Sequence, residues 1–149
     1  MKLETIAIYI LTGLLVISSM LYIGSWFYSN FEPAIEYGEY NVIIPPQTTA
    51  PSSVRLCRDF KFNRAADLQI SRYLVREEAG ITLSIDVGST VVHREPGLMR
   101  QCRDIHIPDC TPEGNWIFRT YVSWEDWPRW RHTEKAPDIP LRVVASECE

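Results

Sequence analysis

The chain has 149 residues, with 15 Lys and Arg against 19 Asp and Glu, a formal net charge of −4 and 46% hydrophobic residues. This balance predicts no basic face for nucleic acid, and the ordinary composition excludes collagen-like and wholly disordered chains. Only about 95 residues remain for a folded core once an anchor and a stalk are set aside, which excludes kinases and doubly wound enzymes. We therefore expect the sequence to reveal an architecture without identifying a partner molecule.

The first segment, residues 1–28, predicts a membrane anchor. No Asp, Glu, Lys or Arg lies between Glu4 and Glu32. As a helix, Ile6–Phe27 would be about 33 Å long, enough for a hydrocarbon layer of about 30 Å. Lipid also requires a helix, because each backbone N–H and C=O must be paired within the segment. A cleaved signal peptide is the alternative, but the apolar stretch is longer than usual and no convincing cleavage site follows it.

The charges that flank this segment predict its orientation. The α-amine and Lys2 lie on one side, whereas Glu32 and Glu36 follow on the other. The positive-inside bias then leaves the N-terminus in the cytoplasm and exports the C-terminal domain to the periplasm or the cell exterior, with association with a virion as a further option. The first expected partner is therefore the lipid bilayer, through residues 6–27.

Residues 29–54 predict an extended stalk. The segment is rich in proline and contains the sequence QTTAPSS. This composition favours polyproline-like chain over packed structure. The apolar run Tyr40–Ile44 interrupts the pattern, and we interpret it as a short strand that docks on the domain itself or on a partner.

Residues 55–149 predict a mainly β domain. Apolar and polar residues alternate in short runs separated by Gly and Pro, which is the period of half-buried strands. The expected strands cover residues 54–62, 67–76, 81–87, 90–94, 100–107, 115–124 and 139–146. About seven short strands without an amphipathic helix predict an antiparallel β-sandwich of immunoglobulin or fibronectin-III type, and a small barrel is the alternative.

The cysteines all lie in this domain and are candidates for two disulfides. An exported domain of this size has a small core and gains stability from such bonds. Three connectivities are open for Cys57, Cys102, Cys110 and Cys148. A strand from Cys102 onward would hold Cys102 and Cys110 about 25 Å apart, too far for a bond. The strand order favours two pairs, Cys57 with Cys102 and Cys110 with Cys148.

No motif predicts catalysis or a cofactor. Ser84–Thr90 is similar to the phosphate-binding turn of actin-like ATPases, but that fold needs two large domains, so we interpret it as a strand with a Gly-containing turn. His93, His106 and His132 raise the question of a metal site, but a strand around His106 would disperse the neighbouring ligands. We therefore assign no catalytic residue, cofactor or metal ligand.

The segment Trp124–Arg131 is the leading candidate for a protein contact. Its Trp residues, at every third position, cannot share one face of a strand, and Pro128 interrupts regular pairing. Trp and Arg often anchor protein interfaces, and Arg can stack on indole rings. The candidate residues are Trp124, Trp127, Arg129, Trp130 and Arg131. In the alternative interpretation, Trp124 fills the sandwich core and the other two rings cover its open end.

The sequence around the first two cysteines is repeated, as Leu56-Cys-Arg-Asp-Phe60 and Gln101-Cys-Arg-Asp-Ile105, which we interpret as strands of similar orientation. The order of anchor, Pro-rich stalk, Cys-Arg-Asp strands, Pro112-x-Gly-x-Trp-x-Phe118 and Trp124-Glu-Asp-Trp-Pro128 resembles small membrane-anchored β-sandwich proteins of unassigned function from bacteriophage genomes. The resemblance covers most of the chain, but its motifs are structural. It implies a phage-encoded envelope or virion-associated protein and supplies no catalytic residue.

These features favour a non-enzymatic, single-pass membrane protein that presents a β-sandwich for binding another protein or for assembly. One alternative is a phage lysis or superinfection-exclusion protein that acts at the host membrane, whose effect on the cell would require residues 1–28. Another alternative is a small periplasmic metal carrier or hydrolase, which predicts a cleft with convergent His and carboxylate side chains.

Overall fold

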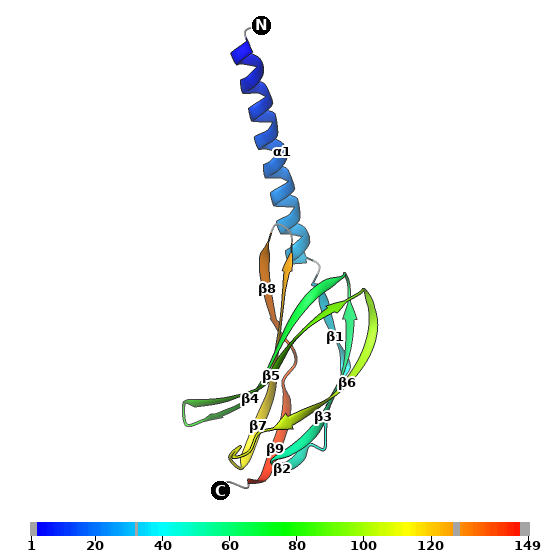
Figure 1. Cartoon of the computed structure of the whole chain (residues 1–149), viewed down its shortest axis with the longest axis vertical. Helices are drawn as coiled ribbons and strands as arrows, with labels where there is room; N and C mark the ends of the chain where they lie inside the picture. The colour runs from blue at the N-terminus through cyan, green and yellow to red at the C-terminus, as the bar shows by residue number, and fades with distance from the viewer. Residues whose placement is uncertain (1–2, 32, 127–128, 147–149) are drawn as a thin grey trace. The chain divides into compact units, whose positions relative to one another are not determined.

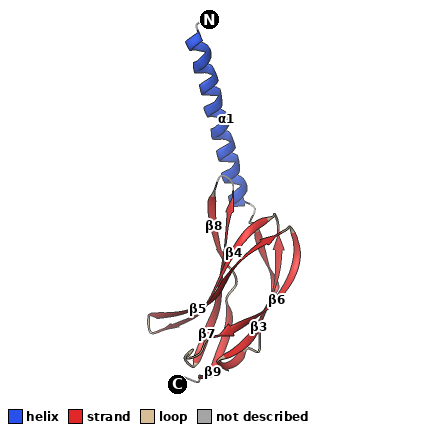
Figure 2. Cartoon of the chain, in the orientation of Figure 1, coloured by secondary structure: helices blue, strands red, loops and turns tan. Residues whose placement is uncertain are grey.

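The structure is a computed structural model and describes residues 3–31, 33–126 and 129–146. It contains one N-terminal helix and a mainly β part, which belong to separate compact units (Figures 1 and 2). The helix and the β part are therefore described one after the other.

Helix α1 spans Leu3–Phe31 and is apolar along most of its length. The stretch Ile6–Tyr28 is long and apolar enough to cross a membrane, and none of it is buried. A hydroxyl group within it has a backbone partner, because Thr12 Oγ1 donates to the Ile8 carbonyl at 2.7 Å. Such a bond satisfies the hydroxyl where no water is present. The prediction of one N-terminal helix with the length and hydrophobicity of a membrane span is confirmed.

In the described part of the chain, nine strands form two sheets (Figure 1). The strands are β1 (Ile35–Ile44), β2 (Gln47–Ala50), β3 (Ser52–Phe62), β4 (Ala66–Glu78), β5 (Ile81–Arg94), β6 (Gly97–Ile107), β7 (Gly114–Asp126), β8 (Trp130–Lys135) and β9 (Ile139–Ser146). The first sheet has the order β1-β3-β6, and the second has the order β2-β9-β7-β4-β5, with β8 paired to β7. Two sheets that share a core form a sandwich, as predicted, whereas the immunoglobulin or fibronectin-III type stays a prediction.

The predicted stalk over residues 29–54 differs from the structure, which places β1 and β2 inside the sandwich. β1 pairs antiparallel with β3, and β2 pairs parallel with β9. Ile35 and Ile43 are buried, with 1% and 5% of their surface exposed. The prolines that suggested a stalk stand at the breaks between strands, where a missing backbone donor costs little. The sandwich therefore begins at β1, about twenty residues before the predicted boundary at residue 55.

The strand count also differs from the predicted seven. Residues 81–87 and 90–94 were expected as two strands around a turn, but they form the single strand β5. At Gly88 the backbone has φ 112°, and the pairing of β5 with β4 shifts register between Ser71 and Tyr73. A glycine with positive φ is compatible with such a bulge and keeps the strand continuous.

The core of the sandwich is divided into two clusters of buried side chains. The larger cluster contains residues from both sheets, including Leu56 on β3, Leu74 on β4 and Phe118 on β7. The smaller cluster lies further along the same strands and includes Phe62, Leu68, Val122 and Trp124. Burial of each such side chain contributes roughly 1.5–3 kcal/mol.

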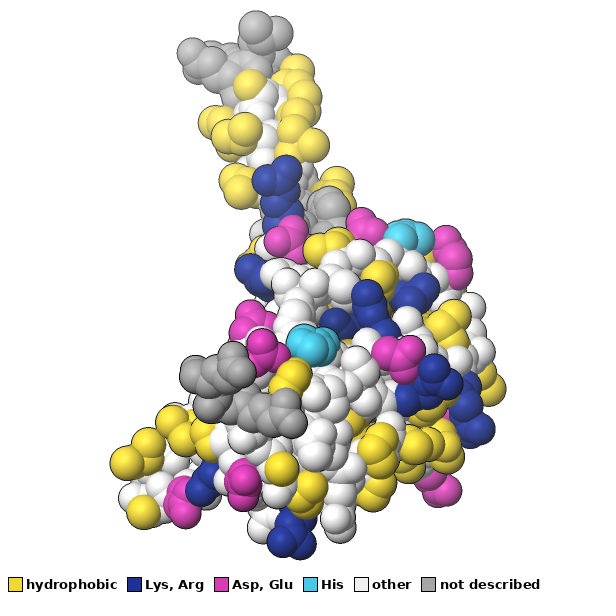
Figure 3. Space-filling view, turned by 60° about the horizontal axis from the view of Figure 1, so that its bottom comes forward, with side chains coloured by type: hydrophobic (Ala, Val, Ile, Leu, Met, Phe, Trp, Pro, Cys, Tyr) yellow, Lys and Arg dark blue, Asp and Glu magenta, His cyan; other side chains and the backbone are white. Residues whose placement is uncertain are grey.

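The β4–β5 hairpin carries exposed apolar side chains at the edge of the second sheet. β5 pairs only with β4 among the described strands. Ile81 and Leu83 are 65% and 45% exposed, and Val91 is 74% exposed. In the space-filling view, hydrophobic side chains gather on the projecting end of this hairpin, at the lower left (Figure 3). An exposed strand edge with apolar side chains is a surface that another chain can cover.

Candidate functional site

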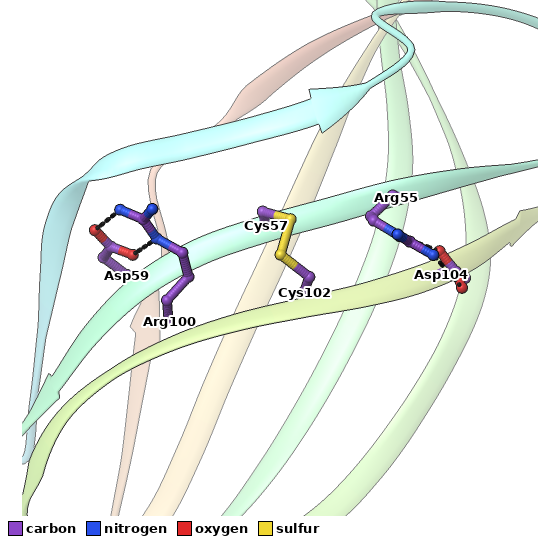
Figure 4. Close-up of a disulfide and its surroundings, with 6 residues drawn as sticks. All are labelled: Arg55, Cys57, Asp59, Arg100, Cys102 and Asp104. Carbon is purple, nitrogen blue, oxygen red and sulfur yellow. Dashed lines mark hydrogen bonds and ion pairs between the residues drawn. A yellow bond between two sulfur atoms is a disulfide. The ribbon is translucent and has the colours of Figure 1, made fainter.

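The two copies of the Cys-Arg-Asp repeat lie side by side on β3 and β6. The two strands are antiparallel, and Cys57 lies directly opposite Cys102. The predicted disulfide between these residues is present (Figure 4). The expectation that the repeats have similar orientations is wrong, because the strands run in opposite directions. The predicted bond between Cys110 and Cys148 involves a residue outside the described ranges and stays a prediction.

The antiparallel pairing turns the repeat into two ion pairs on the outer face of the first sheet. Each cysteine is preceded by an arginine two positions earlier, at Arg55 and Arg100. Arg55 lies opposite Asp104, and its Nε donates to Asp104 Oδ1 at 2.9 Å. Arg100 lies opposite Asp59, and its Nε donates to Asp59 Oδ1 at 2.6 Å. The disulfide therefore lies between two arginine–carboxylate pairs (Figure 4).

The arginines of these outer pairs lower the pKa of their partner carboxylates. Hydrogen bonding to Arg100 holds the pKa of Asp59 below its usual range, and Arg55 has the same effect on the pKa of Asp104. The guanidinium carbon of Arg100 also lies 4.1 Å from the centroid of the Tyr40 ring. All four charged groups of the pairs retain access to water, so solvent screens their attraction.

The second arginines of the repeats, Arg58 and the more exposed Arg103, lie at positions of the opposite face, where Arg72 of β4 joins them. Arg58 on β3 is only 2% exposed, and Arg72 on β4 is 7% exposed. Together with Arg103 on β6 they line a cavity of about 30 Å³ between the sheets. The other lining residues are Leu56, Phe60, Ile70, Gln101, Thr120 and Val122.

This polar layer lies between the two core clusters. On β3, Arg58 separates Leu56 of the larger cluster from Phe62 of the smaller one. On β7, the buried Thr120 stands between the two clusters in the same way. The cavity therefore occupies the middle of the sandwich, where a β-sandwich would ordinarily have apolar side chains.

The arginines of this layer have few partners. Arg58 Nη2 donates to the Pro137 carbonyl at 3.0 Å, but within the described ranges its Nε and Nη1 have no hydrogen-bond partner. Arg72 Nη1 and Arg103 Nη1 both donate to Thr90 Oγ1, at 3.2 and 3.4 Å. None of the three forms an ion pair with another described residue.

Burial, with a further contribution from neighbouring positive charge, lowers the pKa values of Arg58 and Arg72. Burial lowers the pKa of Arg58 to about 10, and the charge of Arg72 acts in the same direction, against the opposing effects of Tyr37 and Asp138. Burial and the charge of Arg103 lower the pKa of Arg72. The layer is therefore a cluster of cations with insufficient negative charge around it.

The predicted contact segment is only partly described. Trp124 is 5% exposed, and its ring stacks on that of His132 with 5.5 Å between centroids, which favours the alternative that Trp124 fills the core. Arg131 is exposed and donates from Nη2 to Gln69 Oε1 at 2.6 Å. Arg129 is exposed with φ 105°. Trp127 and the side chain of Trp130 lie outside the described part of the chain.

The histidines do not gather at a common site. His93 Nδ1 and Nε2 lie 2.7 and 3.2 Å from carboxylate oxygens of Asp67 and Glu95, and these hydrogen bonds raise the pKa of His93. His132 contacts Trp124, on the other side of the predicted turn. Among the described residues, no three His, Cys, Asp or Glu side chains lie together in a way that suits a metal ion.

The inward arginines were missed by the sequence analysis, although the alternation of apolar residues contains the signal. On β3 the residues Val54, Leu56, Phe60 and Phe62 point inward, and Arg58 has the same parity. On β4 the inward residues Leu68, Ile70 and Leu74 bracket Arg72 in the same way. An arginine at an inward position of a strand is therefore the pattern that predicts a buried cation.

The fold and these surfaces define a β-sandwich protein with one apolar N-terminal helix. No known protein family matches the sequence, and no curated protein is significantly similar to it. Among solved structures, the sporulation control protein Spo0M from Bacillus subtilis is similar, with a TM-score of 0.41 and 12% sequence identity over 78% of this chain. This chain spans about half of Spo0M, 51% of its length.

Proposed function

We propose that the chain is a non-enzymatic, single-pass membrane protein that presents its β-sandwich outside the cytoplasm, where the sandwich binds another protein. The observation that carries the proposal is the coexistence of an exposed apolar helix of spanning length with a disulfide in the sandwich. Disulfides persist in oxidising compartments and are rare in the cytosol. The charge asymmetry around the helix is consistent with this orientation.

The β4–β5 hairpin supports the binding part of the proposal. Ile81 and Leu83 are apolar side chains exposed on an edge strand, and edge strands accept a further strand from another chain. The segment Trp124–Arg131 remains the second candidate contact, with Arg129 and Arg131 exposed.

Orientation is tested in intact cells with a thiol reagent that cannot cross membranes and a fusion of a periplasmic reporter to the C-terminus. We expect an active reporter, a mature product that retains residues 1–28, and cysteines that react only after reduction. Freely alkylated thiols in untreated cells, or a product without the helix, would contradict the proposal.

Partner binding is tested by cross-linking in intact membranes followed by mass spectrometry. The double variant Ile81→Lys/Leu83→Lys is expected to lose a specific cross-linked species that the wild type forms. Val144→Lys on β9, where an exposed apolar residue is also replaced, is the matched control and is expected to retain it. A second double variant, Trp127→Ala/Trp130→Ala, tests the other contact. Unchanged cross-linking in both double variants would remove both surfaces from the proposal.

A phage origin is a further part of the proposal, and it rests on the motif resemblance alone. The neighbouring genes test it. Capsid, tail or lysis genes beside this one would support a phage role, whereas a conserved set of bacterial housekeeping genes would argue against it.

A further inference from the structure

The cavity in the middle of the sandwich combines donors that lack acceptors with positive charges that form no ion pair with another described residue. Arg58 Nε and Nη1 and the Thr120 hydroxyl are buried without partners in the described structure. Arg72 and Arg103 share a single hydroxyl acceptor, that of Thr90. Arg58, Arg72, Arg103 and Thr120, from four different strands, thus line one small space with donor groups.

A buried guanidinium without a counter-ion is costly, because its desolvation is not offset by an opposite charge. Here neighbouring positive charge adds to the effect of burial, since Arg72 lowers the pKa of Arg58 and Arg103 lowers the pKa of Arg72. An anion in the cavity would offset both effects at once. An anion can reach the cavity from solvent on the side of Arg103, which is exposed, whereas Arg58 lies at the buried side.

We propose that this cavity binds the carboxylate of a small organic acid, with Arg58 as its buried anchor and Arg72 and Arg103 as flanking cations. A carboxylate suits the two unpartnered N–H groups of Arg58, because a planar guanidinium binds two carboxylate oxygens through parallel hydrogen bonds. The Thr120 hydroxyl supplies a further donor.

The rest of the lining limits what accompanies the carboxylate. Leu56, Phe60, Ile70 and Val122 supply an apolar wall, which favours a short aliphatic chain over a second charge. A cavity of about 30 Å³ has room for little more than the carboxylate group itself, so the aliphatic chain extends toward the open side of the cavity at Arg103. Short monocarboxylates such as acetate and propionate fit this description better than di- or tricarboxylates.

This site is independent of the proposed function. It lies wholly between strands of the sandwich, and it requires neither the apolar helix nor the exposed side chains of Ile81 and Leu83. Failure of the membrane topology experiments would leave it standing, and failure of the binding experiment below would leave the topology untouched.

The test is thermal unfolding of the full chain in a non-ionic detergent, titrated with sodium propionate. Sodium chloride at matched ionic strength controls for screening, and propionamide controls for the aliphatic chain without the charge. We expect propionate to raise the melting temperature with a saturating dependence on concentration, and both controls to raise it much less. Equal shifts with propionate and chloride, or with propionate and propionamide, would overturn the proposal.

Variants connect the effect to the cavity. Arg58→Met is expected to abolish the propionate shift, whereas Arg55→Gln, on the outer face of the same strand, is expected to retain it. If Arg58→Met does not fold, the variant Arg103→Gln, at an exposed residue, provides the test. We expect it to lower the apparent affinity for propionate roughly tenfold. A full propionate shift in Arg58→Met or in Arg103→Gln would overturn the assignment. Broadening of the ¹³C-carboxylate signal of propionate by the wild type, but not by these variants, is the second readout.

Discussion

The repeat places arginines on both the outer and the inner face of the β3–β6 pair, but the arginines on the two faces have different partners. Outside, Arg55 and Arg100 each face a carboxylate across the strand pair and remain in contact with water. Inside, Arg58 and Arg103 have the same local sequence around them but no carboxylate opposite. The difference arises because side chains alternate between faces, so the arginine two positions before each cysteine lies on the outer face, whereas the arginine directly after it lies on the inner face.

This comparison shows that charge composition alone does not reveal electrostatics in a β protein. Net charge counts all four arginines equally, whereas the sheet gives two of them partners and leaves two with few. The disulfide marks the point about which the two repeats are related, because Cys57 and Cys102 lie opposite one another. Perturbing each face in turn tests whether the two sets of arginines differ as the structure indicates.

The largest effect is expected from removing the disulfide on the outer face. Cys57→Ala/Cys102→Ala should lower the free energy of unfolding by about 2–4 kcal/mol, since the bond closes a long loop in the unfolded chain. Urea unfolding of the oxidised wild type and the double variant measures this loss. Reduction of the wild type should reproduce most of it, and an unchanged urea midpoint in the double variant would contradict the assigned stabilising role.

An intermediate effect, an increase in the free energy of unfolding, is expected from replacing an arginine on the inner face. Arg58→Met replaces a buried, unpaired charge by an apolar side chain of similar length, so at low concentrations of small anions stability should rise by up to about 2 kcal/mol. Leu56→Ala, one inward position away, should instead lose about 2–5 kcal/mol. Chemical denaturation of both variants makes the comparison. A loss in Arg58→Met as large as that in Leu56→Ala would mean that Arg58 is well partnered in the folded protein.

The smallest effect is expected from the outer ion pairs and appears as a pH dependence. The folded pKa values of Asp59 and Asp104 are lowered by their arginines, so the contribution of each pair is present above the unfolded pKa of an aspartate. It is lost as the pH falls through the lowered folded pKa. Unfolding measured between about pH 6 and pH 2 should therefore be less steeply acid-sensitive in Asp59→Asn/Asp104→Asn. Added salt should reduce the difference, and identical slopes in the two proteins would contradict it.

Much of the sandwich follows from the sequence because its strands alternate regularly. The strand predicted over 139–146 matches β9, and the one over 54–62 lies within β3. β1 and β2 were missed because proline marks both extended linkers and the ends of strands, and only tertiary pairing with β3 and β9 distinguishes them. β8 was missed because it lies in a segment between two prolines that reads as a loop.

In the candidate site, only the disulfide could be predicted from the sequence. The pairing of Cys57 with Cys102 can be predicted from the order of the strands, which the sequence indicates. The position of Arg55 opposite Asp104 depends on the register of β3 and β6, which the sequence does not indicate. The cavity depends on arginines from three strands that meet across two sheets. Such a meeting is a property of the packed sandwich, and no local pattern on a single strand contains it.

The polar layer also affects how the sandwich opens. Because Arg58, Arg72 and Thr120 interrupt the apolar interior, the two hydrophobic clusters share no continuous packing along these strands. We therefore expect amide protons at one end of the sandwich to exchange with solvent independently of those at the other end, which hydrogen exchange would measure. An anion bound in the cavity would connect the two clusters, so its binding should make the unfolding of the whole domain more cooperative.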